Sequence, residues 1–503
     1  MTTTTRNRLR RIAAGAALAG LLAGCSVTPH PMTAADDDAR AQSIRANVTA
    51  HQEPVTAPID LYEAMARALK YNLDYRVEQR QQALKGRELN LSTYDMLPQL
   101  VASGGYFGRS NEAGASSLSL LTQRQSLEPS TSTDRDVASG DLTLSWDVLD
   151  FGLSYVRAKQ KADGVLIAAE ERRKVSNRII EDVRTAYYRA VSAQRLLTQL
   201  TQLQTTIAAT LENSEALAQR RKSPPLIALT YQRELIEIEA QTKSLGRELR
   251  IAKTQLAALM NLDPGTDYEL VLPPREAELP TVALSADEEV MTALRNRPEL
   301  REVGYQQRIN KHELDSQILA MFPSLKGFVG INADSNGFLY NSHWAQYGAK
   351  SAFNLINVFR LGAVKKTVHA QDDVLRSKEL ATAMAVMTQV QVARARYGLY
   401  ASELATARHG HAVQARIMGQ IDGGFKAGAI SEQTQLRERM NTLVSEVRYD
   451  IAYADAQNAY ANLYAAMGID SFTPEVTDRQ SVHGLAGALQ AMWAQRAVAM
   501  RGN

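Results

Sequence analysis

Two long stretches without proline most constrain what this chain can fold into. The 503-residue sequence has no proline at positions 151–223 and none at positions 324–473. Proline interrupts helices because it lacks a backbone N–H and clashes with the preceding turn. The second stretch is mostly Ala, Gln, Glu, Arg and Leu, which are good helix formers. Helices this long exceed those of ordinary globular domains, so the sequence predicts coiled-coil or helical-barrel geometry.

Both stretches carry a coiled-coil pattern of apolar residues. The predicted helices cover about residues 153–222 and 361–426, which corresponds to roughly 105 and 100 Å at a rise of about 1.5 Å per residue. Core packing alone explains such a pattern locally, but the length of these helices favours a supercoil, in which alanine lets helices approach closely. Apolar residues recur at steps of three and four at Val183, Ala186, Ala190, Ala193, Leu197 and Leu200, and again at Ala383, Val386, Val390, Ala393, Tyr397 and Tyr400.

The chain also contains an internal repeat. Residues 68–100 align without a gap with residues 293–325, and 10 of the 33 aligned positions are identical. The identical positions include Pro98 and Pro323, each of which follows a predicted helix. Internal similarity of this kind indicates one structural unit used twice. We therefore expect the two halves of the chain to share one plan, with a longer insertion in the first half.

A predicted pair of strands follows the first helix of each half. Pro98 and Pro323 end these helices, because proline also restricts the residue before it. Within residues 141–149, Leu142 and Leu144 alternate with Asp, Thr and Ser, which predicts a strand with one apolar and one polar face. The same alternation occurs in soluble hairpins and in outer-membrane barrel strands whose polar face points inward.

Each half is thus expected to contain a helix, a strand pair, a very long helix, a tight tip and a return helix. The first of these helices is expected at about residues 60–96. We predict a signal peptide at 1–24 and a lipidated N-terminal segment at 25–58. The first repeat is expected at 59–262, with a strand pair at 99–148 and a tip at 222–226, and a linker follows at 263–286. The second repeat is expected at 287–470, with a strand pair at 324–355 and a tip at 423–431, and a C-terminal tail at 471–503 holds a short helix.

The N-terminus has the features of a bacterial lipoprotein signal. Four arginines within residues 6–11 precede an apolar run at 12–23, which is too short to stay in a bilayer as a spanning helix. A Leu-Ala-Gly-Cys tetrapeptide ends at Cys25, the only cysteine of the chain. We expect its thiol to carry a lipid such as palmitate and its freed amine a further acyl chain, because a single chain anchors a protein only marginally. Ser26 follows where Asp would signal retention in the inner membrane, so the outer membrane is the expected location. A plain secretory signal with an accidental cysteine is the alternative.

Charge and motif content argue against other classes. Four of the 57 Lys and Arg residues lie in the signal, which leaves 53 basic against 54 acidic residues and a net charge of about −1. Such a chain has no excess of basic residues for binding nucleic acid. If Cys25 is lipidated, no disulfide is possible. His409 and His411 lie two apart, so a helix would point them to different faces, which makes a poor metal pair. The chain has neither a phosphate-binding loop nor a nucleophile elbow. We expect no catalytic residue, no metal and no cofactor.

The order and spacing of these features resemble the TolC-like outer-membrane factor family over about residues 59–470. The resemblance rests on the repeat, the junctions MLPQL and MFPSL, WDVLDFG at 146–152, FKAG at 425–428 and YADAQNAYANLYAAMGID at 453–470. It implies a mainly α fold with a membrane β-barrel, in which three chains contribute four strands each to one 12-stranded barrel. The long helices would form a hollow periplasmic α-barrel about 100 Å deep, and Cys25 would tether the N-terminus beside it.

The resemblance also implies function and partners. Such a homotrimer, held in outer-membrane lipid, would act as the passive duct of a tripartite efflux system that exports small toxic compounds. It would dock on a periplasmic adaptor, or membrane fusion protein, and on an inner-membrane transporter. Proline at 224 and 225 replaces the glycine-centred turn common in the family, which stiffens the first tip. The resemblance assigns adaptor contact to Ser223, Pro224, Pro225 and Leu226 on one tip and to Gly428, Ala429 and Ser431 on the other.

One departure from the family concerns the predicted periplasmic gate. Many members carry Asp after the second tip, where an acidic ring narrows the closed pore. This chain has Thr434 and Arg437 there, with Glu432 and Glu438 nearby. These residues are either a gate closed by an Arg–Glu network or a solvated polar helix face, since an exposed ion pair stabilises little.

Two other functions remain open at the level of sequence. The outer-membrane component of a type I protein secretion system would have the same architecture, and the lipoprotein signal favours efflux over it. A lipid-tethered periplasmic coiled-coil scaffold would explain the heptad pattern but not the repeated strand pairs.

Overall fold

A computed structural model describes residues 29–126, 128–219, 225–263, 265–274, 279–282, 284–469 and 480–499 of the protein. The chain divides into two compact units, residues 1–53 and 54–503. In its described part the first unit contains helix α2 (Ala34–Val48), which Thr33 and Asp36 open with a capping box. Cys25 and the predicted signal peptide lie outside the described residues, so the lipoprotein signal stays a prediction.

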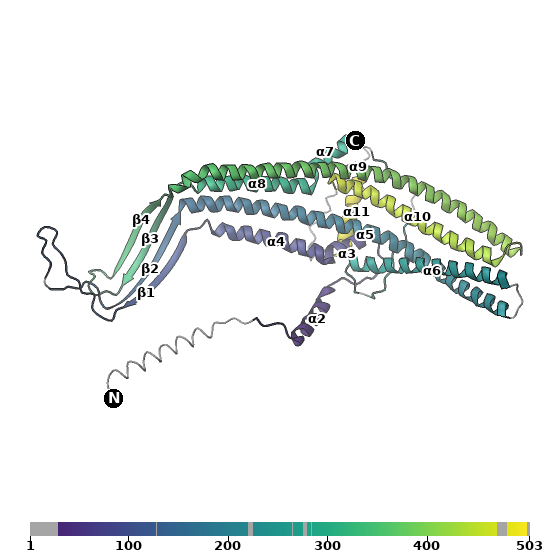
Figure 1. Ribbon diagram of the computed structural model, residues 1–503, viewed down its shortest axis with the longest axis horizontal. Helices are drawn as coiled ribbons and strands as arrows, with labels where there is room; N and C mark the ends of the chain where they lie inside the picture. Colours follow the sequence, from purple (N-terminus) through teal and green to yellow (C-terminus); the bar gives the residue numbers. More distant parts are fainter. Residues whose placement is uncertain are drawn as a thin grey trace, which may run out of the picture. The chain divides into compact units, whose positions relative to one another are not determined.

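The second unit is mostly helical, with one four-stranded sheet. α5 lies alongside α4, α6 and α8, and α9 lies alongside α8 and α10 (Figure 1). The described elements are α3 (Leu61–Tyr71), α4 (Leu73–Tyr94), β1 (Gln99–Gly108), β2 (Asp136–Asp147), α5 (Val148–Gln219), α6 (Pro225–Leu259), α7 (Ala286–Asn296), α8 (Pro298–Leu319), β3 (Ser324–Asp334), β4 (His343–Ala352), α9 (Ile356–Lys426), α10 (Glu432–Met467) and α11 (Val482–Ala499).

The single helix expected at 60–96 is wrong, because the chain forms two helices there. Asn72 has an extended backbone with ψ of 128°, and its N–H donates to the Ala68 carbonyl at the end of α3. Its side chain then accepts the Tyr75 N–H at 3.2 Å and caps α4. Arg297 is extended in the same way between α7 and α8, and Pro298 takes the first helical position of α8.

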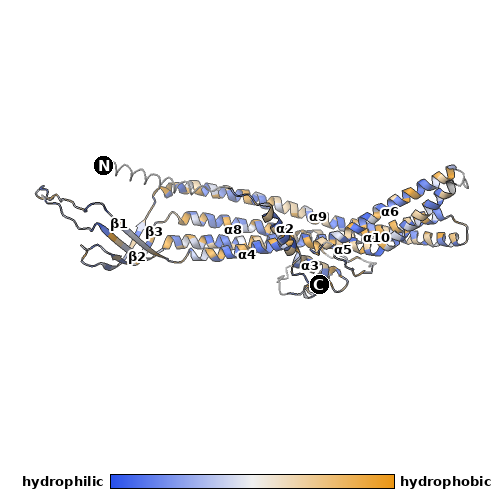
Figure 2. Cartoon of the chain, turned by 90° about the horizontal axis from the view of Figure 1, so that it is seen from below, coloured by the Kyte–Doolittle hydropathy of each residue, from blue (hydrophilic) through white to orange (hydrophobic). Residues whose placement is uncertain are grey.

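The long helices are held by apolar side chains where three helices meet. Leu200 on α5, Leu235 on α6 and Leu443 on α10 belong to one buried cluster, and Leu235 has no exposed surface. Burial of a leucine contributes about 1.5–3 kcal/mol, so this cluster fixes the return helix α6 against α5 and α10. Hydrophobic and hydrophilic residues alternate along these helices in Figure 2. Among the described residues no helix is both long and apolar enough to cross a membrane.

The sheet is antiparallel, with strand order β1-β2-β3-β4. Its register places Leu100 opposite Leu144, Leu144 opposite Val329 and Val329 opposite Tyr347 on one face. This apolar face is the exposed one, because Leu144, Val329 and Tyr347 are 42%, 51% and 86% exposed. The residues between them along β2 and β3 are polar for the most part and less exposed. The predicted two-faced strand is therefore present, and its apolar face is the more exposed one.

Helix α11 lies within the predicted C-terminal tail and packs on the middle of the helical region. It lies against α3, with Leu485 and Leu489 fully buried. Trp493 contacts the rings of Tyr460 and Tyr464 on α10, and the Arg184 guanidinium lies 5.0 Å from the centre of its ring. A cation so placed is attracted to the face of the indole. The expected short helix thus links α10, α5 and α3.

Candidate docking and gating site at the helix tips

The connection between α9 and α10 follows from local backbone chemistry. Gly428 adopts a left-handed conformation with φ of 72°, which glycine tolerates best. The Ala429 N–H donates to the Gly424 carbonyl at 2.8 Å, the bond of a Schellman motif that satisfies a free carbonyl at a helix end. Ser431 then begins α10, because its Oγ accepts the Thr434 N–H at 3.3 Å. The predicted tip is thus a tight turn closed by backbone and capping hydrogen bonds.

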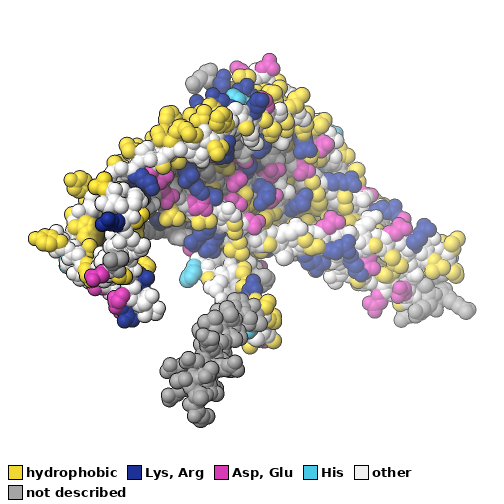
Figure 3. All heavy atoms as spheres, turned by 60° about the vertical axis from the view of Figure 1, so that its left-hand side comes forward, with side chains coloured by type: hydrophobic (Ala, Val, Ile, Leu, Met, Phe, Trp, Pro, Cys, Tyr) yellow, Lys and Arg dark blue, Asp and Glu magenta, His cyan; other side chains and the backbone are white. Residues whose placement is uncertain are grey.

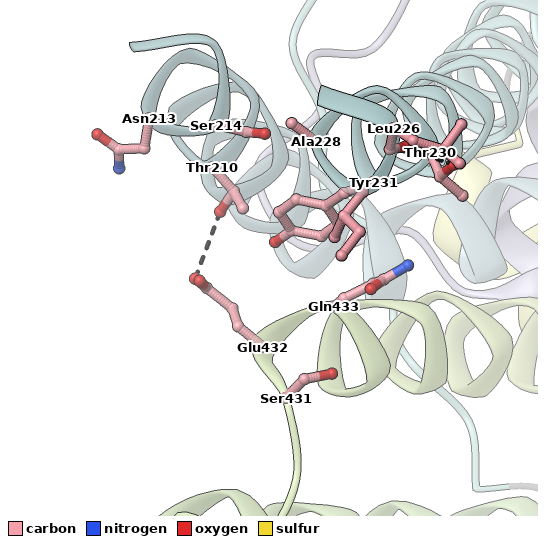
Figure 4. A pocket seen from close by; sticks show the side chains of 11 residues that line it. Thr210, Asn213, Ser214, Leu226, Ala228, Thr230, Tyr231, Ser431, Glu432 and Gln433 are labelled. Atoms are coloured by element: carbon pink, nitrogen blue, oxygen red, sulfur yellow. Dashed lines mark hydrogen bonds between the residues drawn. The ribbon is translucent and has the colours of Figure 1, made fainter. Parts of the chain in front are cut away.

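A groove of about 620 Å³ lies where the end of α5 and the beginnings of α6 and α10 meet (Figure 4). Its α6 wall carries Leu226 and Ile227, which are 77% and 64% exposed. The opposite wall is polar, and the Thr210 hydroxyl donates to Glu432 Oε1 at 3.4 Å. The residues that line the groove are Thr210, Asn213, Ser214, Leu226, Ile227, Ala228, Thr230, Tyr231, Ser431, Glu432 and Gln433.

Tyr231 is the aromatic side chain of this groove. In Figure 4 its ring projects from α6 into the space between α5 and α10. Partial burial raises the pKa of the Tyr231 phenol, and the negative charge of Glu432 raises it further. The phenol therefore remains a hydrogen-bond donor at neutral pH. The groove combines apolar surface with an aromatic ring, as a protein-binding surface often does, and adds a carboxylate at its polar wall.

The structure brings only part of the predicted adaptor-contact set together. Leu226 and Ser431, from different tips, line the same groove. Pro225 is the exposed first residue of α6, while Gly428 and Ala429 lie in the α9–α10 turn and do not line the groove. Ser223 and Pro224 lie outside the described residues. Exposed Ile227 and Leu229 were not predicted, although their apolar character next to a tip is a signal that the sequence contains.

Three of the four predicted gate residues contact neighbouring helices, and Thr434 contacts Ser431 at the start of its own helix. Arg437 forms an ion pair with Glu234 on α6 and not with Glu432 or Glu438. Glu438 accepts a hydrogen bond from Gln414 Nε2 on α9 at 2.8 Å. Thus α10 has polar links to both of its neighbours at the same level.

Further polar contacts reinforce the link between α9 and α10. Asp422 Oδ1 accepts a hydrogen bond from Gln435 Nε2 at 2.7 Å and lies 3.8 Å from the Arg439 guanidinium. Sequence reasoning missed Glu234 and Asp422. Glu234 lies 203 residues before Arg437, and no local pattern indicates such a pairing.

In the described part of the chain, no group of three or more potential metal ligands occurs. His411 stacks on Tyr449 with ring centres 5.8 Å apart, and its Nδ1 lies 3.2 Å from the Ser445 hydroxyl. His411 therefore has a packing role between α9 and α10.

Comparisons with known proteins extend the picture from the site to the fold. No family model matches the sequence, and no curated protein matches it. Solved structures do match. CusC, studied for transmembrane channel formation, is 18% identical with a TM-score of 0.60, over 88% of this chain and 100% of its own. The Campylobacter jejuni CmeC outer membrane channel is 14% identical with a TM-score of 0.63, over 88% and 93%.

A third match is the open state of the Neisseria gonorrhoeae MtrE outer membrane channel. It is 16% identical with a TM-score of 0.56, over 81% of this chain and 88% of its own. At such low identity these matches establish the fold. They cover 81% to 88% of this chain, so the resemblance predicted from the sequence is confirmed at this level. The chain has the fold of the TolC-like outer-membrane channels.

Proposed function

We propose that this protein is the outer-membrane channel of a tripartite efflux system. One observation carries the proposal: the sheet exposes its apolar face and turns its polar residues to the less exposed face. A soluble sheet would bury the apolar face. Lipid reverses this preference, because the outside of a membrane barrel is apolar and its lumen is polar.

Three copies of the chain are needed to complete such a barrel. Strands β1 and β4 are the edges of the four-stranded sheet, so each carries backbone groups without a strand partner among the described residues. An open edge in lipid leaves N–H and C=O groups unsatisfied at several kcal/mol each. Pairing of β1 with β4 of the next copy closes the barrel. Three chains give about 12 strands, a number within the range of outer-membrane barrels.

The helices extend this lumen as a periplasmic duct. The order helix, strand pair, 71- or 72-residue helix, return helix occurs in both halves, and we propose that the two halves are related by the internal repeat. Each long helix spans roughly 105 Å. Three copies of the helical pairs would then surround one hollow α-barrel.

The helix tips supply the contact with a periplasmic adaptor. The groove at Leu226, Tyr231 and Ser431, together with exposed Ile227 and Leu229, offers apolar surface that a soluble monomer has no reason to expose. An adaptor seated there would connect the duct to an inner-membrane transporter. The apolar residues would supply affinity, and Glu432 would supply orientation.

The ion pair of Arg437 with Glu234 is proposed to hold the tip closed. Arg437 is 47% exposed, so the pair stabilises the tip by only about 0–1 kcal/mol. A weak contact suits a gate that must open when the adaptor binds. Arg437→Ala should increase the current through the channel, and Glu234→Gln should do the same. Unchanged current in both variants would favour a solvated helix face.

The N-terminus is proposed to carry the lipid anchor. Cys25→Ala should abolish labelling by palmitate, and labelling that persists would contradict the lipoprotein signal. The barrel itself should still insert in the outer membrane, since its own apolar face supports it.

The experiment that tests the proposed function is single-channel recording. The detergent-extracted protein is added to planar bilayers, and its mass is measured by light scattering. Discrete current steps from a species of about three times the chain mass of 55.3 kDa are expected. A soluble species without current would overturn the channel and favour a lipid-tethered scaffold.

A further inference from the structure

The polar face of the sheet carries a pair of lysines at the end nearest the helices. Lys326 on β3 and Lys350 on β4 are direct partners in the strand register. Like charges directly opposite each other destabilise a strand pair. The fold therefore accommodates an electrostatic repulsion that replacement of either lysine by a neutral residue would remove.

In the described part of the chain, Lys326 and Lys350 form no ion pair and no hydrogen bond. The acid of the same row, Asp147 on β2, is the register partner of Lys326. Its Oδ1 accepts the Leu149 N–H at 2.8 Å and lies 3.4 Å from the Asp150 N, so it caps α5.

The neighbouring positions on this face offer no other acid. Phe328 and Gly348 are the next register pair, and a Cβ added to Gly348 would lie 2.8 Å from the Phe328 ring. The ring thus covers the wall beside the lysines. On the other side lies the pair Ser324 and Ala352, which is also uncharged.

Apart from Asp147, the acids of this face lie toward the other end of the strands. Asp141 pairs with Asn332 in the register, six residues along β3 from Lys326. Six residues of a strand span about 20 Å, which is at least twice the screening length of about 8–10 Å at physiological salt. Asp141 Oδ2 also accepts a hydrogen bond from Thr143. The lysine row is therefore electrostatically separate from Asp141.

We propose that Lys326 and Lys350 form a binding site for multivalent anions, such as phosphate-bearing or polycarboxylate solutes, in the lumen of the channel. This inference rests on the proposed trimer, in which three copies would place six lysines at one level of the barrel. Figure 3 shows Lys and Arg side chains, with Asp and Glu, on a hollowed face of the second unit and hydrophobic side chains along its outer edge. A ring of lysines in a narrow lumen focuses the field and concentrates anions. Such a ring would also make this channel differ from a channel whose lumen is lined by acidic residues and selects cations.

The test is block of the single-channel current by tripolyphosphate at low salt. The wild-type current should fall as tripolyphosphate is added, and the block should weaken as salt is raised. The variant Lys326→Gln/Lys350→Gln should need roughly ten times more tripolyphosphate or more for half block, because the opposing charge is gone. Lys326→Arg/Lys350→Arg retains the charge and should retain the block.

Lys243→Gln is the matched control, because it removes one exposed lysine on α6, far along the chain from the sheet. Its block should equal that of the wild type. Equal block in the Lys326→Gln/Lys350→Gln variant, or no block of the wild type, overturns the anion site and leaves the channel in place. Failure to obtain any current overturns the proposed function and the anion site together.

Discussion

At the residue scale, glycine with a left-handed backbone ends both α9 and α10. Gly468 has φ of 67°, and its N–H donates to Ala465 while the Ile469 N–H donates to Tyr464. This is the same Schellman pattern that Gly428 forms at the tip. The Gly468 carbonyl also accepts a hydrogen bond from Arg173 on α5, which ties the end of α10 to that helix. A single residue thus fixes where α10 ends.

We expect Gly468→Ala to destabilise the fold. An added Cβ would lie 2.8 Å from the Asn296 carbonyl carbon and 2.9 Å from the Arg297 nitrogen, and backbone atoms move little. The left-handed conformation alone costs a non-glycine residue about 1–3 kcal/mol. Thermal unfolding of the variant should show a clearly lower Tm. Gly487→Ala on α11 is the control, since a Cβ there meets nothing within 4 Å and alanine favours a helix by about 0.5–1 kcal/mol.

A second residue-scale prediction concerns Asp455 on α10. Burial raises the pKa of its carboxyl, Arg189 lowers it and Glu403 raises it, with a net upward direction. The folded state therefore binds the proton more tightly than the unfolded state, and stability falls as pH rises through the raised pKa. Asp455→Asn should be more stable than the wild type at about pH 7, and the difference in Tm should shrink toward about pH 4. A difference independent of pH would contradict this assignment.

At the scale of elements, sequence periodicity predicted the long helices well. The steps of three and four along α5 and α9 are local, and Pro98 and Pro323 mark where helices give way to strands. The break at Asn72 escaped prediction because the apolar pattern continues through it. Asn72 is a good N-cap, and this capping preference overrode the continuity of the pattern.

The candidate site was only partly predictable for a related reason. Leu226 and Ser431 were identified as tip residues from turn chemistry, which is local. The partner of Arg437 was not, because the approach of α6 to α10 is set by the buried cluster around Leu235. The spacing of residues along the sequence does not indicate which exposed acid this cluster brings within reach of Arg437.

Helix α6 allows stability and docking to be separated. Leu235→Ala removes a side chain with no exposed surface and should cost about 2–5 kcal/mol. Leu229→Ala, on the same helix, removes a side chain that is 62% exposed, so it should leave the Tm nearly unchanged. Under the proposed function, Leu229→Ala should instead weaken binding of the adaptor, measured by co-purification. Loss of Tm in both variants would show that the exposed leucine is part of the core.

At the scale of the whole molecule, the fold leaves two requirements that one chain does not meet. The sheet has open edges at β1 and β4, and its apolar face is exposed. Under the proposed function, other copies of the chain would meet the first requirement and lipid would meet the second. Both requirements follow from the four strands, although helices make up most of the described chain.

Cross-linking tests whether copies of the chain meet edge to edge. Ser103 lies on β1 and Gln346 on β4, both on the polar face of the sheet. If β1 pairs with β4 of the next copy, a variant with Ser103→Cys and Gln346→Cys, treated with a bifunctional maleimide, should give dimers and trimers on a denaturing gel. The ladder should stop at the trimer, because a closed ring has no further edge. Ser139→Cys with Asp334→Cys is the control, since these residues are register partners within one chain and should link only internally. Monomers alone from the edge pair, or a ladder beyond the trimer, would contradict a closed three-chain barrel.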